Sequence, residues 1–166
     1  QERVTETVKA AATEVKDLST TNNNSVLNSA VKLLKRHRDV MFIANHDKKP
    51  ISIIISTLAA HTYRGESSLV DALLNMLPRM LSKLQDLNFV VCNPVTPEEN
   101  FTDKWPKNPE LKVAFVSWLI KAKSDFERVL VGELDAEKQK IIESILGCHF
   151  SSETNRLGSS SMLMSS

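Results

Sequence analysis

The sequence predicts an all-α fold, a bundle of about four to five helices, and three observations lead to this prediction. Apolar residues recur at steps of three to four along most of the chain, which is the period of amphipathic helices. Runs of alternating apolar and polar residues, typical of half-buried strands, are almost absent. The 166 residues suffice for one hydrophobic core, and we expect a single helical domain over residues 25–150.

The two ends of the chain differ from this domain in composition. Residues 1–24 are polar and close with a Ser/Thr/Asn run, whose side chains compete for backbone hydrogen bonds, so they predict a connector. Residues 151–166 are rich in serine and have no apolar period, which predicts a disordered tail. The first residue is Gln rather than Met, which suggests a fragment of a longer protein, although processing could produce the same start.

The first two helices are expected at residues 25–45 and 51–63. Ser25 can cap the first helix. Its apolar stripe consists of Leu27, Val31, Leu34, Met41 and Phe42. The second segment is ambiguous, because its β-branched isoleucines would also suit a buried strand. Its length and its alanine-rich end favour a buried helix, with Pro50 in the first turn and Gly65 as the C-cap.

Three further helices complete the predicted bundle. A serine pair at 67–68 can cap a long helix with a wide leucine-rich face, in which Pro78 is expected to cause a bend. Another helix is expected from 109 to 132, with a proline in its first turn and a glycine at its end. The last and shortest helix runs between a capping Asp135 and a closing Gly147.

Composition and charge narrow the classes of function. The chain has 21 Lys+Arg against 20 Asp+Glu, so no field of the whole molecule would attract nucleic acid or an acidic membrane. The spacing of Cys92 and Cys148 fits neither a zinc motif nor a disulfide framework, and we expect reduced thiols. No apolar run approaches the length of a membrane span, and the first residues lack a signal peptide. We therefore expect a soluble, cytoplasmic protein without a membrane or nucleic-acid partner.

The most specific motif is a loop with two prolines three residues apart. It runs from Asn93 to Phe101 as Asn-Pro-Val-Thr-Pro-Glu-Glu-Asn-Phe, with Trp105 close behind. It resembles the Asp/Asn-Pro-x-x-Pro-x-x-Asn loop in the C-terminal helical half of oligoadenylate-synthetase-like nucleotidyltransferases. Upstream, residues 34–42 and 49–60 resemble the same half of the cGAS/DncV-like enzymes that make cyclic oligonucleotides against phage, the CBASS synthases. The three blocks stand in the order of that family, and the resemblance covers about residues 4 to 130.

The catalytic half of that family has no counterpart in this sequence. Such enzymes need a Gly-Ser that opens a helix and an Asp-x-Asp/Glu pair with a third carboxylate, because two metal ions are held beside the triphosphate. The Gly-Ser here, Gly158-Ser159, lies in the predicted tail without an acidic pair after it. The resemblance implies that an N-terminal core upstream of Gln1 supplies these groups and holds Mg²⁺. We expect this chain alone to be inactive.

Lys35 and Ser52 are the candidate nucleotide-binding residues. Lys35 lies on the polar flank of its helix, and an ammonium group suits triphosphate oxygens. The resemblance implies that Lys35 contacts the donor phosphates with help from Ser52, at a helix start suited to anions. Without the resemblance, both would be taken for a solvated lysine and a capping serine. The neighbouring Lys32, Lys49 and Arg36 remain rivals.

Other residues of reactive or metal-binding types are interpreted as structural. His37-Arg38-Asp39 is similar to the protein-kinase catalytic loop, but Ala44 stands where that motif needs Asn. Arg36 and Arg38 are expected to pair with acidic neighbours such as Asp39 or to contact the catalytic half. The remaining structural assignments concern side chains expected to pack or to lie at the surface, namely His46, His61, His149, Trp105 and Trp118. The Asn93–Asn100 loop could touch a nucleotide, but its prolines and asparagine caps favour a rigid connection between helices.

The resemblance implies a function for the complete protein. Such an enzyme joins nucleoside triphosphates, with Mg²⁺, into a cyclic oligonucleotide that signals phage infection, and regulatory CBASS proteins are possible partners. The helical half would contribute contacts to nucleotide phosphates and bases. A helical dimerisation or adaptor module is the alternative, since the core pattern permits it equally well. A nucleic-acid sensor is weaker, although the helix that carries Lys32, Lys35, Arg36 and Arg38 is locally basic.

Overall fold

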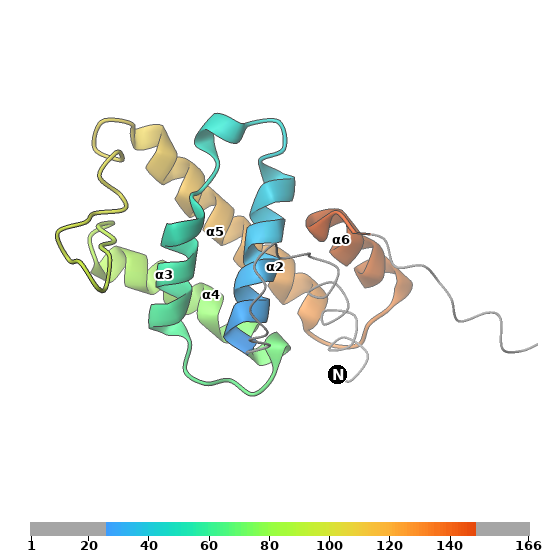
Figure 1. Ribbon diagram of the computed structural model, residues 1–166. Helices are drawn as coiled ribbons and strands as arrows, with labels where there is room; N and C mark the ends of the chain where they lie inside the picture. Colours follow the sequence, from blue (N-terminus) through green and yellow to red (C-terminus); the bar gives the residue numbers. More distant parts are fainter. Residues whose placement is uncertain (1–25, 149–166) are drawn as a thin grey trace, which may run out of the picture.

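The computed structural model describes residues 26–148, which form a bundle of five α-helices (Figure 1). The elements are α2 Val26–Met41, the short 3₁₀ helix η1 His46–Lys48, α3 Ser52–Thr62, α4 Leu69–Asp86, α5 Pro109–Leu130 and α6 Ala136–Leu146. Within this range no strand forms, and Cys92 and Asn100 make an isolated antiparallel bridge. The predicted all-α bundle is confirmed. The predicted connector, the cap Ser25, the tail with Gly158-Ser159, and His149 lie outside the described residues.

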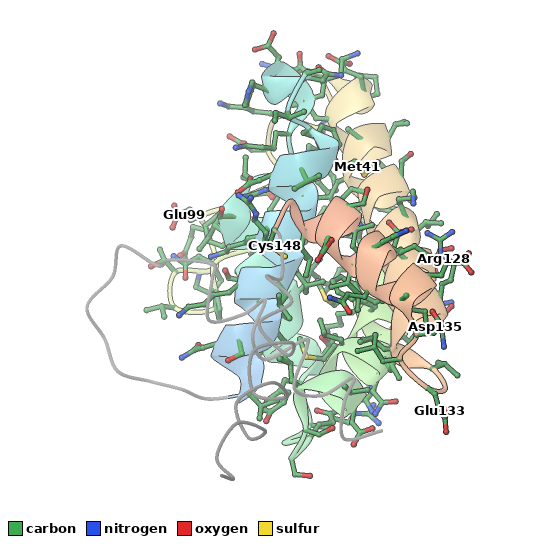
Figure 2. All side chains as sticks on the ribbon, turned by 90° about the vertical axis from the view of Figure 1, so that its right-hand side faces the viewer. Met41, Glu99, Arg128, Glu133, Asp135 and Cys148 are labelled. Atoms are coloured by element: carbon green, nitrogen blue, oxygen red, sulfur yellow. The ribbon has the colours of Figure 1, made fainter. Side chains whose placement is uncertain are left out.

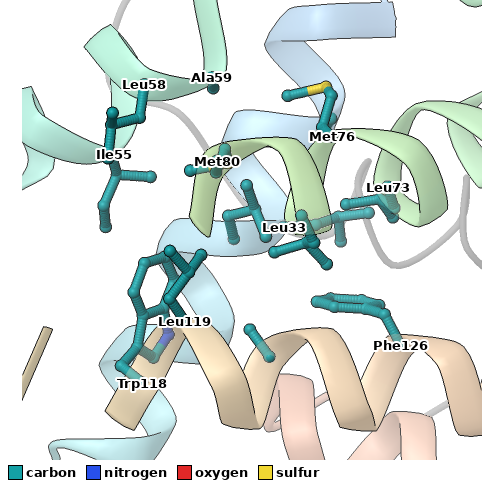
Figure 3. Close-up of a cluster of buried hydrophobic side chains, with 14 of the residues drawn as sticks. Leu33, Ile55, Leu58, Ala59, Leu73, Met76, Met80, Trp118, Leu119 and Phe126 are labelled. Atoms are coloured by element: carbon teal, nitrogen blue, oxygen red, sulfur yellow. The ribbon is translucent and has the colours of Figure 1, made fainter. Parts of the chain in front are cut away.

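The core lies where α2, α3, α4 and α5 meet (Figure 3). Helix α4 packs on α2, α3 and α5, while α6 lies on one side of the bundle against α2 and α5 (Figure 2). The largest fully buried side chains are Trp118, Phe115 and Phe126, all on α5. The expected packing roles of Trp105 and Trp118 are confirmed, since both are buried. The helical bundle thus has one continuous core, and burial of the apolar helix faces stabilises it.

Local sequence signals fix several helix ends. The Ser68 side chain accepts a hydrogen bond from the Asp71 amide at 3.0 Å, and the Asp135 side chain accepts one from the Lys138 amide at 2.8 Å. Gly147 follows α6 in the left-handed conformation, with φ of 59°. A Cβ at Gly147 would also come within 3.0 Å of the Val40 side chain on α2. These predicted caps are confirmed, and Gly147 additionally permits close packing of two helices.

The connection between α2 and α3 differs from the prediction. Helix α2 ends at Met41 rather than near Asn45, and the chain turns through η1. Lys49 is extended, with φ of −61° and ψ of 126°, as expected for a residue before proline. Pro50 therefore lies before the helix and not in its first turn, since Ile51 is the N-cap of α3.

The α3 segment is helical as predicted but is buried on one side only. Ile54 and Ile55 are buried, whereas Ile51 and Ile53 are 50% and 46% exposed. The expectation that the whole isoleucine run is buried was therefore wrong, because a helix turns successive residues to different faces. The predicted C-cap at Gly65 was wrong too. Tyr63 is the C-cap, and Gly65 adopts its positive φ of 80° in the following loop.

The proline loop is held together by its asparagines. The Asn93 amide donates to the Glu99 carbonyl at 2.8 Å, which joins the two arms of the loop. The side-chain oxygens of Asn93 and Asn100 each accept a hydrogen bond from the backbone N–H two residues further on, at 2.9 and 2.8 Å. These local hydrogen bonds fit the interpretation of the loop as a rigid connection between α4 and α5.

Candidate functional site

Arg38 joins α2 to the start of α3. Its side chain is buried, and its Nη1 donates to the Pro50 carbonyl at 2.9 Å and to the Ser52 hydroxyl at 2.8 Å. Asp39 accepts from Arg38 Nε at 3.0 Å, and the Lys49 ammonium lies 3.4 Å from the same carboxylate oxygen. We call Arg38, Asp39, Lys49 and Ser52 the junction cluster. Two cations share one carboxylate here, so the cluster favours an anion.

Ser52 is the first residue of α3 and is exposed. The N-cap residue Ile51 makes no side-chain cap, so it leaves the first backbone N–H groups of α3 without that partner. The Ser52 hydroxyl accepts from Arg38 and can still donate its own proton. A helix start with a free hydroxyl proton and nearby cations is chemically suited to phosphate oxygens.

Lys35 lies on α2, one helical turn before the junction cluster. It precedes Arg38 by three residues and Asp39 by four, a spacing that places side chains on the same side of a helix. Its side chain is half buried. The two predicted site residues thus come from the two helices that Arg38 connects, although Arg38 is the residue that contacts the Ser52 hydroxyl.

The rivals of Lys35 occupy different surroundings. Lys49 belongs to the junction cluster, and Lys32 is half buried on α2. Arg36 contacts the other side of the molecule, where its Nε donates to the Leu146 carbonyl at 2.6 Å and its Nη2 to the Gly147 carbonyl at 3.0 Å. A cation at these carbonyls stabilises the C-terminal end of α6. Arg38 therefore pairs with Asp39 as predicted, whereas Arg36 binds backbone carbonyls instead of an acidic neighbour.

A second polar cluster is buried between α2 and α5. The His37 Nε2 lies 2.8 Å from Asp125 Oδ2, and the Trp118 Nε1 donates to His37 Nδ1 at 3.2 Å. The Lys121 ammonium donates to the other oxygen of Asp125. We call His37, Trp118, Lys121 and Asp125 the core cluster. Because Trp118 can only donate, the His37 Nδ1 must accept, and the proton of a neutral imidazole is on Nε2.

Burial and hydrogen bonds shift the two titratable groups of the core cluster. Burial lowers the pKa of His37, although the hydrogen bond with Asp125 opposes that shift. Burial would raise the pKa of Asp125, but the hydrogen bonds from Lys121 and His37 outweigh it and lower that pKa. A neutral imidazole thus lies between an indole N–H and a carboxylate. This buried arrangement explains why the pKa values of His37 and Asp125 are both lowered.

Comparison with known proteins relates this helical region to a class of enzymes. No family model matches the chain. A c-di-GMP synthase of Roseivirga ehrenbergii is 36% identical over 97 residues, which are 56% of this chain and 26% of that protein. Over this region, the chain is a homologue of the cyclic dinucleotide synthases. The cyclic dinucleotide synthase CdnG of Bradyrhizobium diazoefficiens is 27% identical over 118 residues, which are 68% of this chain and 28% of that protein.

A solved structure shares the fold of this chain. The structure of the Bradyrhizobium diazoefficiens CD-NTase CdnG, a complex with GTP, matches 74% of this chain with a TM-score of 0.56 and 24% identity, and the match covers 39% of that chain. The helical fold of this chain is therefore the fold of a helical part of a CD-NTase. The chain spans about a quarter of the length of the curated synthases that it matches. The suspected family resemblance is confirmed.

Sequence analysis missed most of what surrounds the two candidate residues. His37 and Arg38 were treated as parts of a failed kinase motif, yet each organises a polar cluster. A signal was present, because both stand three or four residues after the apolar Leu34 and thus on the core side of α2. Asp125 gave the same signal, since it lies among the apolar positions of α5. Polar residues at core positions of an amphipathic helix mark buried hydrogen-bond networks.

Three further features of residues 26–148 concern metal ligands, cysteines and the apolarity of the helices. In this range, three or more His, Cys, Asp or Glu side chains nowhere gather as metal ligands, and His46 and His61 are exposed. The thiols of Cys92 and Cys148 are both free. None of the helices described is long and apolar enough to span a bilayer.

Proposed function

We propose that this chain is the helical part of an enzyme that joins nucleoside triphosphates into a cyclic oligonucleotide. The homology to cyclic dinucleotide synthases over the helical region supports this proposal, and it is the observation on which it rests. A catalytic core outside these 166 residues would supply the carboxylates and hold Mg²⁺. The enzyme would work in the cytoplasm, where nucleoside triphosphates are made, as a CBASS component in defence against phage with its regulatory proteins.

In this proposal Lys35 and Ser52 bind the donor phosphates. The junction cluster supports their role, because Arg38 holds the Ser52 hydroxyl at the start of α3 and leaves its proton available. Lys35 would add an ammonium group from the same side of α2. Arg38 and Lys49 strengthen the positive potential at this place, while Asp39 keeps Arg38 oriented.

The proposal predicts that Lys35→Ala slows the complete synthase. Loss of a charge-assisted phosphate contact should lower the rate of product formation by roughly ten- to a thousandfold, about 1.4 to 4 kcal/mol. The measurement is cyclic product formed per time from nucleoside triphosphates and Mg²⁺. Lys140→Ala, an exposed lysine on α6, is the matched control and should keep the parent rate. An unchanged rate in Lys35→Ala at an unchanged melting temperature would move the site to Lys32 or Lys49.

The proposal also predicts that the isolated chain makes no product. Two-metal catalysis needs carboxylates that bind both ions, and residues 26–148 contain no such cluster. Purified chain incubated with four nucleoside triphosphates and Mg²⁺ should yield neither cyclic nor linear oligonucleotide by mass spectrometry. A nucleotide product from clean protein, absent in a mock purification, would show that catalysis does not need the proposed core.

A helical dimerisation or adaptor module is the second candidate. Four large apolar side chains near the junction of α2 and α3 are exposed, namely Met41, Ile43, Ile51 and Ile53. Exposed apolar side chains that lie near one another favour contact with another protein surface. In the first proposal that surface is the catalytic core, and in the second it is another protein. Ile53→Asp should reduce synthase activity if the first proposal is right, and should abolish partner binding without effect on catalysis if the second is right.

A further inference from the structure

A cavity of about 360 Å³ lies between the start of α3, the loop at residues 99–105 and the first turns of α5. Its volume falls within the range of small-molecule binding pockets. Buried side chains form its floor, namely Pro50, Ile54, Trp105 and Phe115. Neither Lys35 nor Ser52 lines it, although Lys49 of the junction cluster does.

Aromatic side chains line the floor of the cavity. The rings of Trp105 and Phe115 lie 5.5 Å apart at an angle of 48°, and only 8% and 1% of these residues are exposed. The half-buried Phe101 adds a further aromatic wall from the loop. Packing fixes these rings before any ligand arrives, and the parts of Trp105 and Phe101 that remain exposed give a ring system apolar contacts.

Asn100 adds a directed hydrogen-bond donor to the wall. Its side-chain oxygen accepts from the amide and from the hydroxyl of Thr102, both at 2.8 Å, so the orientation of the amide group is fixed. The Asn100 side-chain nitrogen makes no hydrogen bond in the part of the chain that the structure describes. Its two N–H groups therefore remain for a ligand, and a carbonyl oxygen or ring nitrogen of a heteroaromatic base accepts such a bond.

Two lysines stand at the mouth of the cavity. Lys48 and Lys104 lie on η1 and on the loop, and neither makes an ion pair within residues 26–148. Lys49, which pairs with Asp39, also lines the cavity, as do the carboxylates of Glu99 and Asp103. The Glu99 carboxylate accepts a hydrogen bond from the Asn93 side chain at 2.6 Å. The ammonium groups of Lys48 and Lys104, with the positive end of α3, offer contacts for an anionic group.

We propose that this cavity binds a nucleotide. The base lies on the aromatic floor and accepts a hydrogen bond from Asn100, and the phosphate lies between Lys48 and Lys104. One ligand thereby uses the apolar floor, the fixed donor and the two lysines together. This goes beyond the proposed function, because it adds a nucleotide site to which Lys35 and Ser52 do not contribute.

The two tryptophans of the chain provide the test. Each gives one indole N–H signal in a nitrogen-15 NMR spectrum of the 166-residue chain, and Trp105→Phe assigns them. Guanosine monophosphate should shift the Trp105 signal and leave the Trp118 signal in place, because Trp118 is fully buried beside His37. Guanosine should bind more weakly because it lacks the phosphate. Inorganic phosphate alone should leave the Trp105 signal unchanged because it lacks the ring.

Matched variants test the two parts of the ligand. Lys104→Gln should weaken binding of guanosine monophosphate roughly fivefold, as expected for one exposed charge contact. Lys107→Gln, an exposed lysine three residues on and outside the cavity, should bind like the parent. Ile51→Trp should block the cavity with its larger ring, whereas Val113→Trp, exposed and outside the cavity, should not. Unchanged melting temperatures establish that each variant is folded.

Three outcomes would overturn the proposal. A Trp105 signal that stays unmoved at millimolar guanosine monophosphate shows that the cavity takes no such ligand. Equal weakening by Lys104→Gln and Lys107→Gln shows an unspecific attraction of the anion. Loss of the Trp105 response in Lys35→Ala places the nucleotide at Lys35 instead of in the cavity. If the response survives in Lys35→Ala while that variant keeps full synthase activity, the phosphate contact proposed for Lys35 fails and the cavity proposal stands.

Discussion

His37 and Arg38 are neighbours on α2, but they serve two polar clusters that differ in their access to water. The core cluster around His37 is closed, because the acceptor at Nδ1 and the donor at Nε2 both have partners inside the bundle. The junction cluster around Arg38 is open at Ser52, which is exposed and still has a proton to donate. A closed cluster holds helices together, whereas an open one can also bind a ligand.

The difference follows from the helix geometry. Successive residues on a helix point about 100° apart, so His37 faces α5 while Arg38 faces the start of α3. Helix α5 is long and covers His37 with Trp118 and Asp125, whereas α3 begins beside Arg38 and leaves its own first N–H groups near solvent. The position of Arg38 beside the start of α3, rather than its charge alone, therefore distinguishes the two clusters.

Loss of Asp125 should have the largest effect of the three changes that test this comparison. Asp125→Ala leaves the His37 Nε2–H buried without an acceptor, and loss of this buried hydrogen bond to a charged group should cost about 3 kcal/mol of unfolding free energy. Urea unfolding of parent and variant measures this loss of unfolding free energy. Glu127→Ala is the control, because Glu127 is an exposed residue of the same helix and pairs with Lys123 at the surface. Equal small losses in both variants would mean that the core cluster is not a structural element.

The pH dependence of stability should come next in size. Burial holds the pKa of His37 below its ordinary value of 6.5. Below pH 6.5 the His37 imidazole therefore becomes protonated in the unfolded chain before it does so in the folded chain. The unfolding free energy should therefore be unaffected by His37 above pH 6.5. Below pH 6.5 it should fall by up to about 1.4 kcal/mol per pH unit.

Unfolding free energies at pH 7.5, 6.5 and 5.5 measure this slope. The range stays above the ordinary pKa of Asp125, 3.8, which is lowered further in the folded chain, so that carboxylate remains ionised. His37→Gln should reduce the slope, while His61→Gln, an exposed control, should retain it. If His37→Gln has the same slope of unfolding free energy against pH as the parent, other groups cause the slope and burial does not lower the pKa of His37.

The smallest effect is expected at the junction cluster. Ser52→Ala removes the hydroxyl that accepts from Arg38, and a hydrogen bond of this kind contributes about 0.5–1.5 kcal/mol. Because Ser52 is exposed, water can replace the hydroxyl, and we expect the lower end of that range. Ser117→Ala, at an exposed position of α5, should change the unfolding free energy less. A loss as large as that of Asp125→Ala would mean that the junction cluster is also closed.

The sequence by itself determined the helices, because the signals that make them are local. The caps at Ser68 and Asp135 and the glycine stop at Gly147 lie within a few residues of the helix ends that they define. The predictions were wrong where the structure depends on packing between segments that are far apart in the sequence. Examples are the turn after Met41 and the exposure of Ile51 and Ile53. The candidates Lys35 and Ser52 came from a family resemblance, and their role stays a prediction.

The tertiary structure alone decided which polar groups meet. His37 and Asp125 are 88 residues apart, and Arg36 binds a carbonyl 110 residues away. The cavity beside Trp105 likewise combines α3, α5 and the proline loop. Helical periodicity places a side chain on a face of its own helix, but the partner across that face depends on how the helices pack. For this reason the sequence predicts the bundle, while the polar clusters and the cavity emerge only when the helices are assembled.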